Sequence, residues 1–199
     1  MKKEDLVADD GYFVENNRIL LRLTSKTDEE NYMKQVIDSS TMKAAYECDI
    51  VYDFTWNRVF QTDFMNLTIL DKKTSDYIGY INIRPLSNEI PELGIDIVEK
   101  HRREGFGYDA VRLVTEQIKL RAGCRTFMVC IYADNTASLS MFHKFPLIEV
   151  GREESEYITA IKSLYQGQDP SAFQKFKEQI AEKWERESQR TIIKYHLKV

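Results

Sequence analysis

The hydrophobic and polar positions along the chain predict strands in the first half and alternating strands and helices in the second. Short apolar runs rich in β-branched and aromatic residues are typical of strands. The predicted strands cover Arg18–Thr24, Phe64–Leu70, Tyr77–Arg84, Pro91–Val98, Arg125–Tyr132, Leu147–Arg152 and Thr191–Leu197. The polar turn Asp71–Asp76 makes the second and third of these an antiparallel hairpin.

Helical spacing of apolar residues predicts the remaining elements. Thr27 or Asp28 caps the first helix, because Glu30 follows Thr27 at the spacing of a capping box. After Gly105 the pattern is that of an amphipathic helix, which Gly123 ends. The other predicted helices cover Met42 to Phe60, Thr136 to Lys144, Ser155–Tyr165 and Ser171–Ser188.

This order of elements predicts a mixed α/β (α+β) fold, with a central mixed sheet flanked by helices. The length of 199 residues suits one domain spanning 1–199. Within it, a helical insertion at about 153–189 precedes the last strand. Five insertion residues at helical spacing are expected to pack on the domain, the alternatives being a roof over a substrate or a dimer contact. These residues are Tyr165, Phe173, Phe176, Ile180 and Trp184.

Composition narrows the classes of function. Hydrophobic residues make up 43% and charged residues 30%, with a formal net charge of −4. A weakly acidic chain is not attracted in bulk to nucleic acid or to an anionic membrane. No apolar run is long enough to span a bilayer, and the spacing of Cys48, Cys124 and Cys130 matches neither a disulfide framework nor a metal site. The expected location is the cytoplasm.

The segment Gly94–Gly107 leads from a strand through a basic glycine loop into a helix. The first amides of a helix have no intrahelical partner and lie at the positive end of its dipole. Gly105 and Gly107 let a diphosphate approach that backbone, and His101 adds cationic character beside the loop. The alternative is a capped helix start with solvated charges.

Gly105–Ala110 also matches G-x-G-x-x-A, which suggests a nicotinamide-dependent oxidoreductase. Two observations disfavour this function. Six mostly charged residues separate Val98 from Gly105, and Arg125 and Thr126 lie where the fingerprint needs an acidic residue.

Two motifs together resemble the GNAT superfamily of N-acetyltransferases. Its pyrophosphate motif, Gln/Arg-x-x-Gly-x-Gly/Ala, corresponds to Arg102–Gly107, and its Asn-x-x-Ser/Ala motif to Asn135–Ser138. Glu92-Leu93-Gly94-Ile95 is similar to a strand of the branch that acetylates ribosomal-protein N-termini and small amines. The resemblance covers roughly 18–152 with the final strand.

The resemblance implies a site for acetyl-CoA with no metal. The amides around Arg103–Tyr108 would bind the pyrophosphate, and the strand end at Ile97–Val98 would pair with the pantetheine arm. Asn135 and Ser138 would hydrogen-bond the cofactor. The full implied set is Ile97, Val98, Arg102, Arg103, Glu104, Gly105, Phe106, Gly107, Tyr108, Asn135, Ser138 and Phe142.

The expected reaction moves an acetyl group to a primary amine, either a peptide α-amine or a small molecule, by direct attack in a ternary complex. Glu92 is the first candidate for the general base, and Glu89 in the loop before it is the second. Phe142 stands where the family has its usual tyrosine acid and has no proton to donate. Tyr132 and Ser138 are the candidate substitutes, and a thiolate leaving into solvent needs neither.

Phe142 motivates an alternative from another class of function, a non-catalytic acyl-CoA-binding sensor or scaffold on the same fold. For the acetyltransferase, the expected partners are acetyl-CoA and an amine acceptor. A homodimer is possible, and neither nucleic acid nor a membrane is expected.

Overall fold

The structure, a computed structural model, describes residues 1–40, 43–167 and 169–199. The described chain divides into two units. The first contains Met1–Val129 and Leu197–Val199, and the second contains Cys130–His196. Each unit is described by itself below.

The first unit contains a sheet of five antiparallel strands, and a sixth strand pairs in parallel with the fifth. Its strands are β1 (Tyr12–Glu15), β2 (Ile19–Leu23), β3 (Met65–Asp71), β4 (Tyr77–Arg84), β5 (Glu92–Ile97) and the start of β6 (Thr126–Tyr132), paired in that order. The hairpin of β3 and β4 confirms the prediction. β1 is a strand that the sequence analysis missed, because four residues are too short for a periodic pattern.

The two faces of this sheet differ in chemistry. Strand residues alternate between faces, and the registers place Leu67, Ile81 and Ile95 side by side on one face. The neighbouring row, Asn66, Asn82 and Gly94, belongs to the opposite, polar face.

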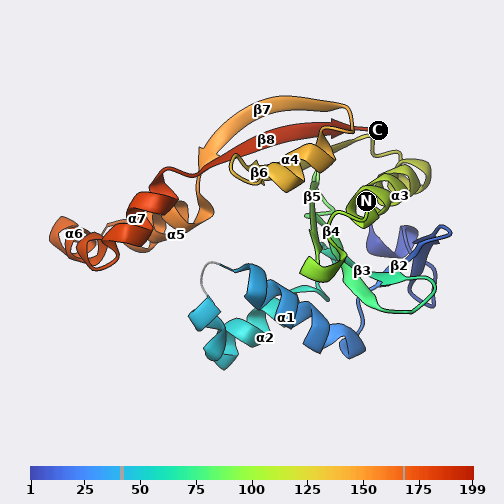
Figure 1. The fold of residues 1–199 in the computed structure, drawn as a ribbon, viewed down its shortest axis with the longest axis horizontal. Helices are drawn as coiled ribbons and strands as arrows, with labels where there is room; N and C mark the ends of the chain where they lie inside the picture. Colours follow the sequence, from blue (N-terminus) through green and yellow to red (C-terminus); the bar gives the residue numbers. More distant parts are fainter. Residues whose placement is uncertain (41–42, 168) are drawn as a thin grey trace. The chain divides into compact units, whose positions relative to one another are not determined.

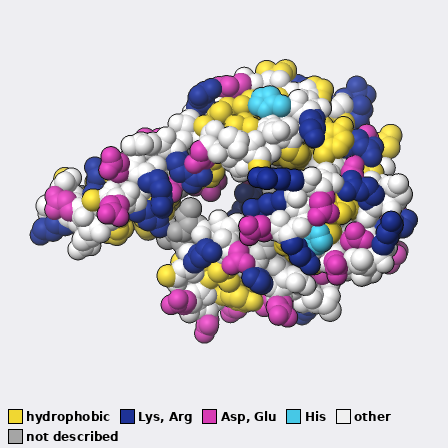
Figure 2. Space-filling view, in the orientation of Figure 1, with side chains coloured by type: hydrophobic (Ala, Val, Ile, Leu, Met, Phe, Trp, Pro, Cys, Tyr) yellow, Lys and Arg dark blue, Asp and Glu magenta, His cyan; other side chains and the backbone are white. Residues whose placement is uncertain are grey.

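Helices α1 (Glu29–Ser39) and α2 (Asp49–Arg58) lie on one side of β3–β5, and α3 (Phe106–Ala122) lies on the other (Figure 1). The polar face is the one toward α1, since Tyr80 of β4 contacts Tyr32 of α1 with ring centroids 4.8 Å apart. Hydrophobic side chains also appear at the surface over α2, where Phe54 is 67% exposed (Figure 2).

The predicted helix boundaries need two corrections at their N-termini. The capping box consists of Ser25 and Asp28 around a short 3-10 turn, Lys26–Asp28, rather than Thr27 and Glu30. The second helical stretch is a 3-10 turn, Lys43–Glu47, followed by α2, and its predicted start at Met42 lies outside the described residues. By contrast, Gly123 ends α3 in the left-handed conformation, as predicted.

The second unit contains the end of β6, then α4 (Thr136–Phe142), β7 (Leu147–Glu154), α5 (Glu156–Leu164), α6 (Pro170–Gln179), α7 (Ala181–Ser188) and most of β8 (Thr191–Lys198). Its strands are ordered β6-β8-β7. One helix was predicted over 171–188, but the chain breaks at Ile180, whose φ of −115° and ψ of 25° leave the helical region. The five insertion residues pack against Tyr157, Ile158 and Ile161 of α5.

No helix among the described residues is long and apolar enough to cross a membrane. None of the three cysteines forms a disulfide with another described residue.

Candidate active site

One backbone edge of β5 forms no hydrogen bonds with β4. The Val98 N–H donates to Ile78 O at 2.9 Å, which makes this a hydrogen-bonded pair of the β4–β5 ladder. Because antiparallel pairs alternate, the Ile97 N–H points away from β4. The ladder between β5 and β6 contains a single pair, Glu92 with Met128. Of the two positions predicted to meet the pantetheine arm, Ile97 therefore has the outward-facing amide.

The loop after β5 contains two residues in the left-handed backbone conformation. A 3-10 turn, Glu99–His101, is followed by Arg103 with φ 66° and Gly105 with φ 87°. Gly105 is the N-cap of α3, whose first helical residue is Phe106. The first amides of α3 lack intrahelical acceptors and lie at the positive end of the helix dipole. The predicted pyrophosphate motif therefore contains the start of α3, an arrangement that in other proteins binds anions.

The basic residues of the loop point to different partners. Arg102 turns back to the strand, with Nε donating to Ile97 O at 2.9 Å and Nη2 lying 3.4 Å from Asp96 Oδ1. Arg103 is exposed and forms no ion pair with any residue that the structure describes. Arg102 thus shapes the loop, whereas Arg103 remains available to an anion.

Arg18, the residue before β2, contacts the predicted pyrophosphate loop and was not among the predicted site residues. Its Nη1 lies 2.8 Å from Asp109 Oδ2 in the first turn of α3, and its Nη2 donates to Glu104 O at 2.6 Å. Its guanidinium also lies 4.6 Å from the centroid of the Phe106 ring. Arg18 holds the loop and neutralises the one acidic side chain of the first turn, which would repel a bound pyrophosphate. Its separation of 86 residues from Glu104 left no local sequence signal.

Glu92, the predicted base, opens β5 and forms an ion pair with the end of β4. Arg84 Nη2 lies 3.0 Å from Glu92 Oε1, and the Glu92 side chain is 34% exposed. The carboxylate therefore remains accessible to a substrate.

The other predicted site residues belong to the second unit, and their geometry is described there. Asn135 caps α4, accepting the Ser138 N–H on Oδ1 at 3.0 Å. The Arg190 guanidinium stacks 3.8 Å from the centroid of the Tyr132 ring. Phe142 is only 2% exposed, so the residue at the family's tyrosine position is a core side chain.

The polar face of the first unit contains an ion pair whose carboxylate, Asp28, is buried and whose guanidinium, Arg22, is 27% exposed. Asp28 accepts two hydrogen bonds from Arg22, at 2.7 and 2.8 Å, and others from the Ser25 N–H and Thr68 Oγ1. Burial acts to raise the pKa of Asp28, but the hydrogen bonds from Arg22 and Ser25 outweigh burial and lower it.

The pKa of Asp96, on the same face, is shifted in the opposite direction. Burial raises the pKa of its carboxyl group, and the nearby Arg102 offsets this only in part. Two amide oxygens of this face, Asn66 Oδ1 and Asn82 Oδ1, are buried without a hydrogen-bond partner among the described residues. A face with desolvated polar groups is typical of a binding surface rather than of a packing surface.

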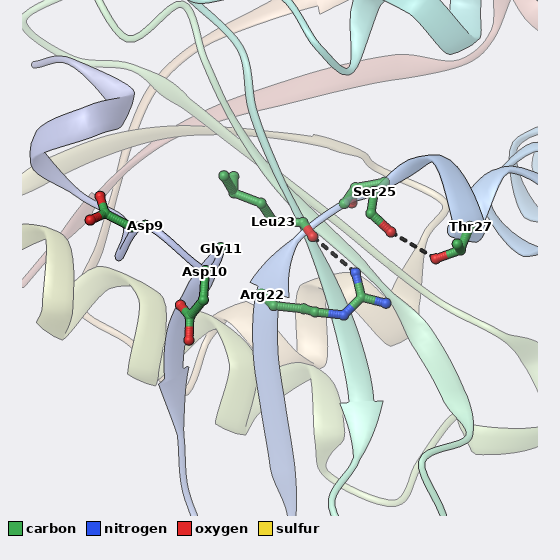
Figure 3. Close-up of a pocket in the computed structure, with 8 residues that line it drawn as sticks. Asp9, Asp10, Gly11, Arg22, Leu23, Ser25 and Thr27 are labelled. Carbon is green, nitrogen blue, oxygen red and sulfur yellow. Dashed lines mark hydrogen bonds between the residues drawn. The ribbon is translucent and has the colours of Figure 1, made fainter.

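A separate surface depression is lined by residues of β2 and the segments beside it, among them Asp9, Asp10 and Thr27 (Figure 3). It contains none of the predicted site residues. The Arg22 cation that borders it is already bound to Asp28 and to Leu23 O.

The comparisons with known proteins decide the family. Residues 18–145 match the family model described as "Acetyltransferase (GNAT) domain". The chain belongs to the GNAT acetyltransferase family. The GNAT match includes Arg18, the loop Arg102–Gly107 and Asn135–Ser138, so both motifs of the sequence-based resemblance lie inside it. The protein is accordingly an acetyl-transferring enzyme by family.

Solved structures share the fold at low sequence identity. The spermidine N-acetyltransferase of Vibrio cholerae, in complex with CoA and spermine, is 12% identical with a TM-score of 0.65, covering 92% of this chain and 96% of its own. A dodecameric structure of the same Vibrio cholerae enzyme is 11% identical with a TM-score of 0.64, covering 92% and 95%. A domain from Methanocaldococcus jannaschii is 20% identical with a TM-score of 0.55, covering 69% and 94%. No curated protein sequence matches the chain.

Proposed function

We propose that the protein transfers the acetyl group of acetyl-CoA to a primary amine by direct attack in a ternary complex. The observation that carries this proposal is the start of α3, where Gly105 caps the helix with φ 87° beside Arg103 and Arg18. This arrangement suits the pyrophosphate of CoA, and the Vibrio cholerae neighbour was solved in complex with CoA.

The rest of the cofactor is proposed to follow β5. The outward amide of Ile97 is suited to pair with the pantetheine arm or to donate to the thioester oxygen, which becomes more negative during attack. Asn135 and Ser138 are proposed to hydrogen-bond the cofactor, as the family resemblance implies.

Glu92 is proposed to be the general base. An ammonium must lose a proton before its nitrogen attacks, and Glu92 accepts that proton directly or through water. The nitrogen then bonds to the carbonyl carbon, the C–S bond breaks, and the nitrogen loses its second proton to solvent. The CoA thiolate takes a proton from Tyr132, Ser138 or solvent.

Calorimetric titration of acetyl-CoA, CoA and NAD into the wild-type protein tests the cofactor. We expect binding of both CoA species and no response to NAD, and a folded protein that binds no CoA would contradict the proposal. Gly105→Asp should weaken acetyl-CoA binding at least about tenfold, because it places a carboxylate against the pyrophosphate. Gly123→Asp is the matched control, since Gly123 is also left-handed but caps the other end of α3. Equal affinities of the two variants would disprove the placement.

Glu92→Gln separates the enzyme from the non-catalytic sensor suggested by Phe142. For an enzyme that uses this base, kcat should fall about 10²–10⁴-fold while acetyl-CoA affinity is retained. A wild-type protein that binds acetyl-CoA but acetylates no amine in a broad panel would support the sensor.

A further inference from the structure

Two guanidinium groups converge on one ring beside the predicted base. Arg58, at the end of α2, lies 5.3 Å from the centroid of the Phe64 ring, and Arg84, at the end of β4, lies 5.8 Å from the same centroid. The chain thus brings together a helix end and a strand end that are 26 residues apart. Arg84 also contacts Glu92 at 3.0 Å, so the pair lies next to the carboxylate proposed to accept the amine proton.

The two cations also act on Tyr32 of α1. Burial raises the pKa of its phenol to about 12, while the charges of Arg84 and Arg58 act in the opposite direction. Both cations therefore lower the pKa of the same hydroxyl group.

The charges of this cluster do not cancel. Glu92 balances Arg84, and Arg58 forms no ion pair with any residue in the described part of the chain. A cation at the C-terminal end of α2 gains from the helix dipole, which accounts for Arg58 alone. It does not account for a second guanidinium at the same ring. Because Arg84 is paired with Glu92 and Arg58 is exposed, the positive charge of Arg58 is the one that an incoming anion would meet.

We propose that the acceptor is an amine that also carries an anionic group, and that Arg58 and Arg84 bind that group. This inference rests on the proposed function, since it assigns the acceptor of the same reaction. Guanidinium groups recognise carboxylate and phosphoryl oxygens through paired N–H donors. With the anion on the arginines, the ammonium of the same molecule lies on the side of Glu92. A polycation such as spermidine places like charge against Arg58 and is a poor substrate.

The test compares free acids with their uncharged amides. Initial rates are measured with acetyl-CoA and L-alanine, L-methionine or L-phenylalanine, each as the free acid and as the carboxamide, with spermidine as the polycation. The free acids should have kcat/KM values at least about tenfold higher than those of their amides. The inference is overturned if the amides or spermidine are used as well as the free acids.

Variants locate the effect at Arg58. Arg58→Gln should reduce the preference for free acid over amide by about tenfold, mainly through KM, and Arg58→Lys should restore part of it. Arg112→Gln is the matched control, since Arg112 lies on α3 and pairs only with Glu116 among the described residues. An unchanged acid-to-amide ratio in folded Arg58→Gln contradicts the assignment.

Failure of the proposed function has a different signature. If no amine is acetylated, the reaction proposed above fails. Titration of N-acetyl-L-methionine and its carboxamide into wild type and Arg58→Gln then tests the anion site alone. Preferential binding of the acid, lost in Arg58→Gln, supports the site, and equal binding of acid and amide overturns it.

Discussion

The two faces of the sheet in the first unit differ in the side chains that the same strands place on them. The apolar face is built from aliphatic side chains such as Leu67 and Ile81, both fully buried. The polar face contains the Asp28–Arg22 ion pair and two amide oxygens that have no partner among the described residues. Desolvated polar groups cost free energy unless they are paired, so the polar face is less favourable for stability. Tyr80 of the polar face also packs against the apolar cluster of Tyr32 and Trp56, so the contrast concerns the desolvated polar groups, and substitutions on the two faces should have different effects.

Removing the Asp28–Arg22 ion pair should give the largest effect on this comparison. Asp28→Ala leaves the Arg22 guanidinium without its carboxylate, so the free energy of unfolding should fall by about 3–5 kcal/mol at neutral pH. Because the folded-state pKa of Asp28 is lowered, its contribution is present above its unfolded pKa and is lost as the pH falls through the folded value. Urea unfolding at several pH values measures this, and a difference from wild type that does not shrink below about pH 4 would contradict it.

A truncation on the apolar face should affect stability alone. Ile81→Ala leaves a cavity between Leu67 and Ile95, and we expect a loss of about 2–5 kcal/mol. Acetyl-CoA affinity, measured at a temperature where the variant is folded, should equal that of wild type. A marked fall in affinity would show that the two faces are not functionally separate.

The smallest expected effect is a gain in stability on the polar face. The pKa of Asp96 is raised by burial, so its contribution to stability is greatest below its unfolded pKa and is lost as the pH rises through the folded value. Asp96→Asn removes this loss and should stabilise the protein at pH 7 by less than about 1 kcal/mol. Unfolding curves of wild type and variant from pH 4 to 8 provide the measurement, and the gain should increase with pH. A loss of stability at pH 7 would mean that Arg102 contributes more than burial costs.

Local signals predicted most of the elements. Gly105 and Gly123 mark both ends of α3, because left-handed backbone at a helix terminus favours glycine. Strand β1 escaped prediction because its four residues, Tyr12–Glu15, are too few for a periodic pattern. No glycine or proline stands at the break at Ile180. Because the helical spacing of apolar residues continues from α6 into α7, the sequence predicted one helix there.

The candidate site was only partly predictable. The two motifs named the residues around Gly105 and Asn135, since the chemistry of each motif lies within a few consecutive positions. Arg18 and Arg58 gave no signal, because an isolated arginine next to a strand or in a helix has the same local pattern whether it is solvated or anchors a site.

The sequence by itself determined the fold class, the family and the loop that starts α3, because each depends on short-range periodicity or on residues that are neighbours in the chain. Only the tertiary structure decided which face of the sheet is polar, which amide of β5 is available and which cations meet. These depend on register, where a shift of one residue exchanges the two faces of a strand, and on contacts across large sequence separations. Arg18 meets Glu104 across 86 residues and Arg84 meets Glu92 across a strand turn because the sheet brings them together.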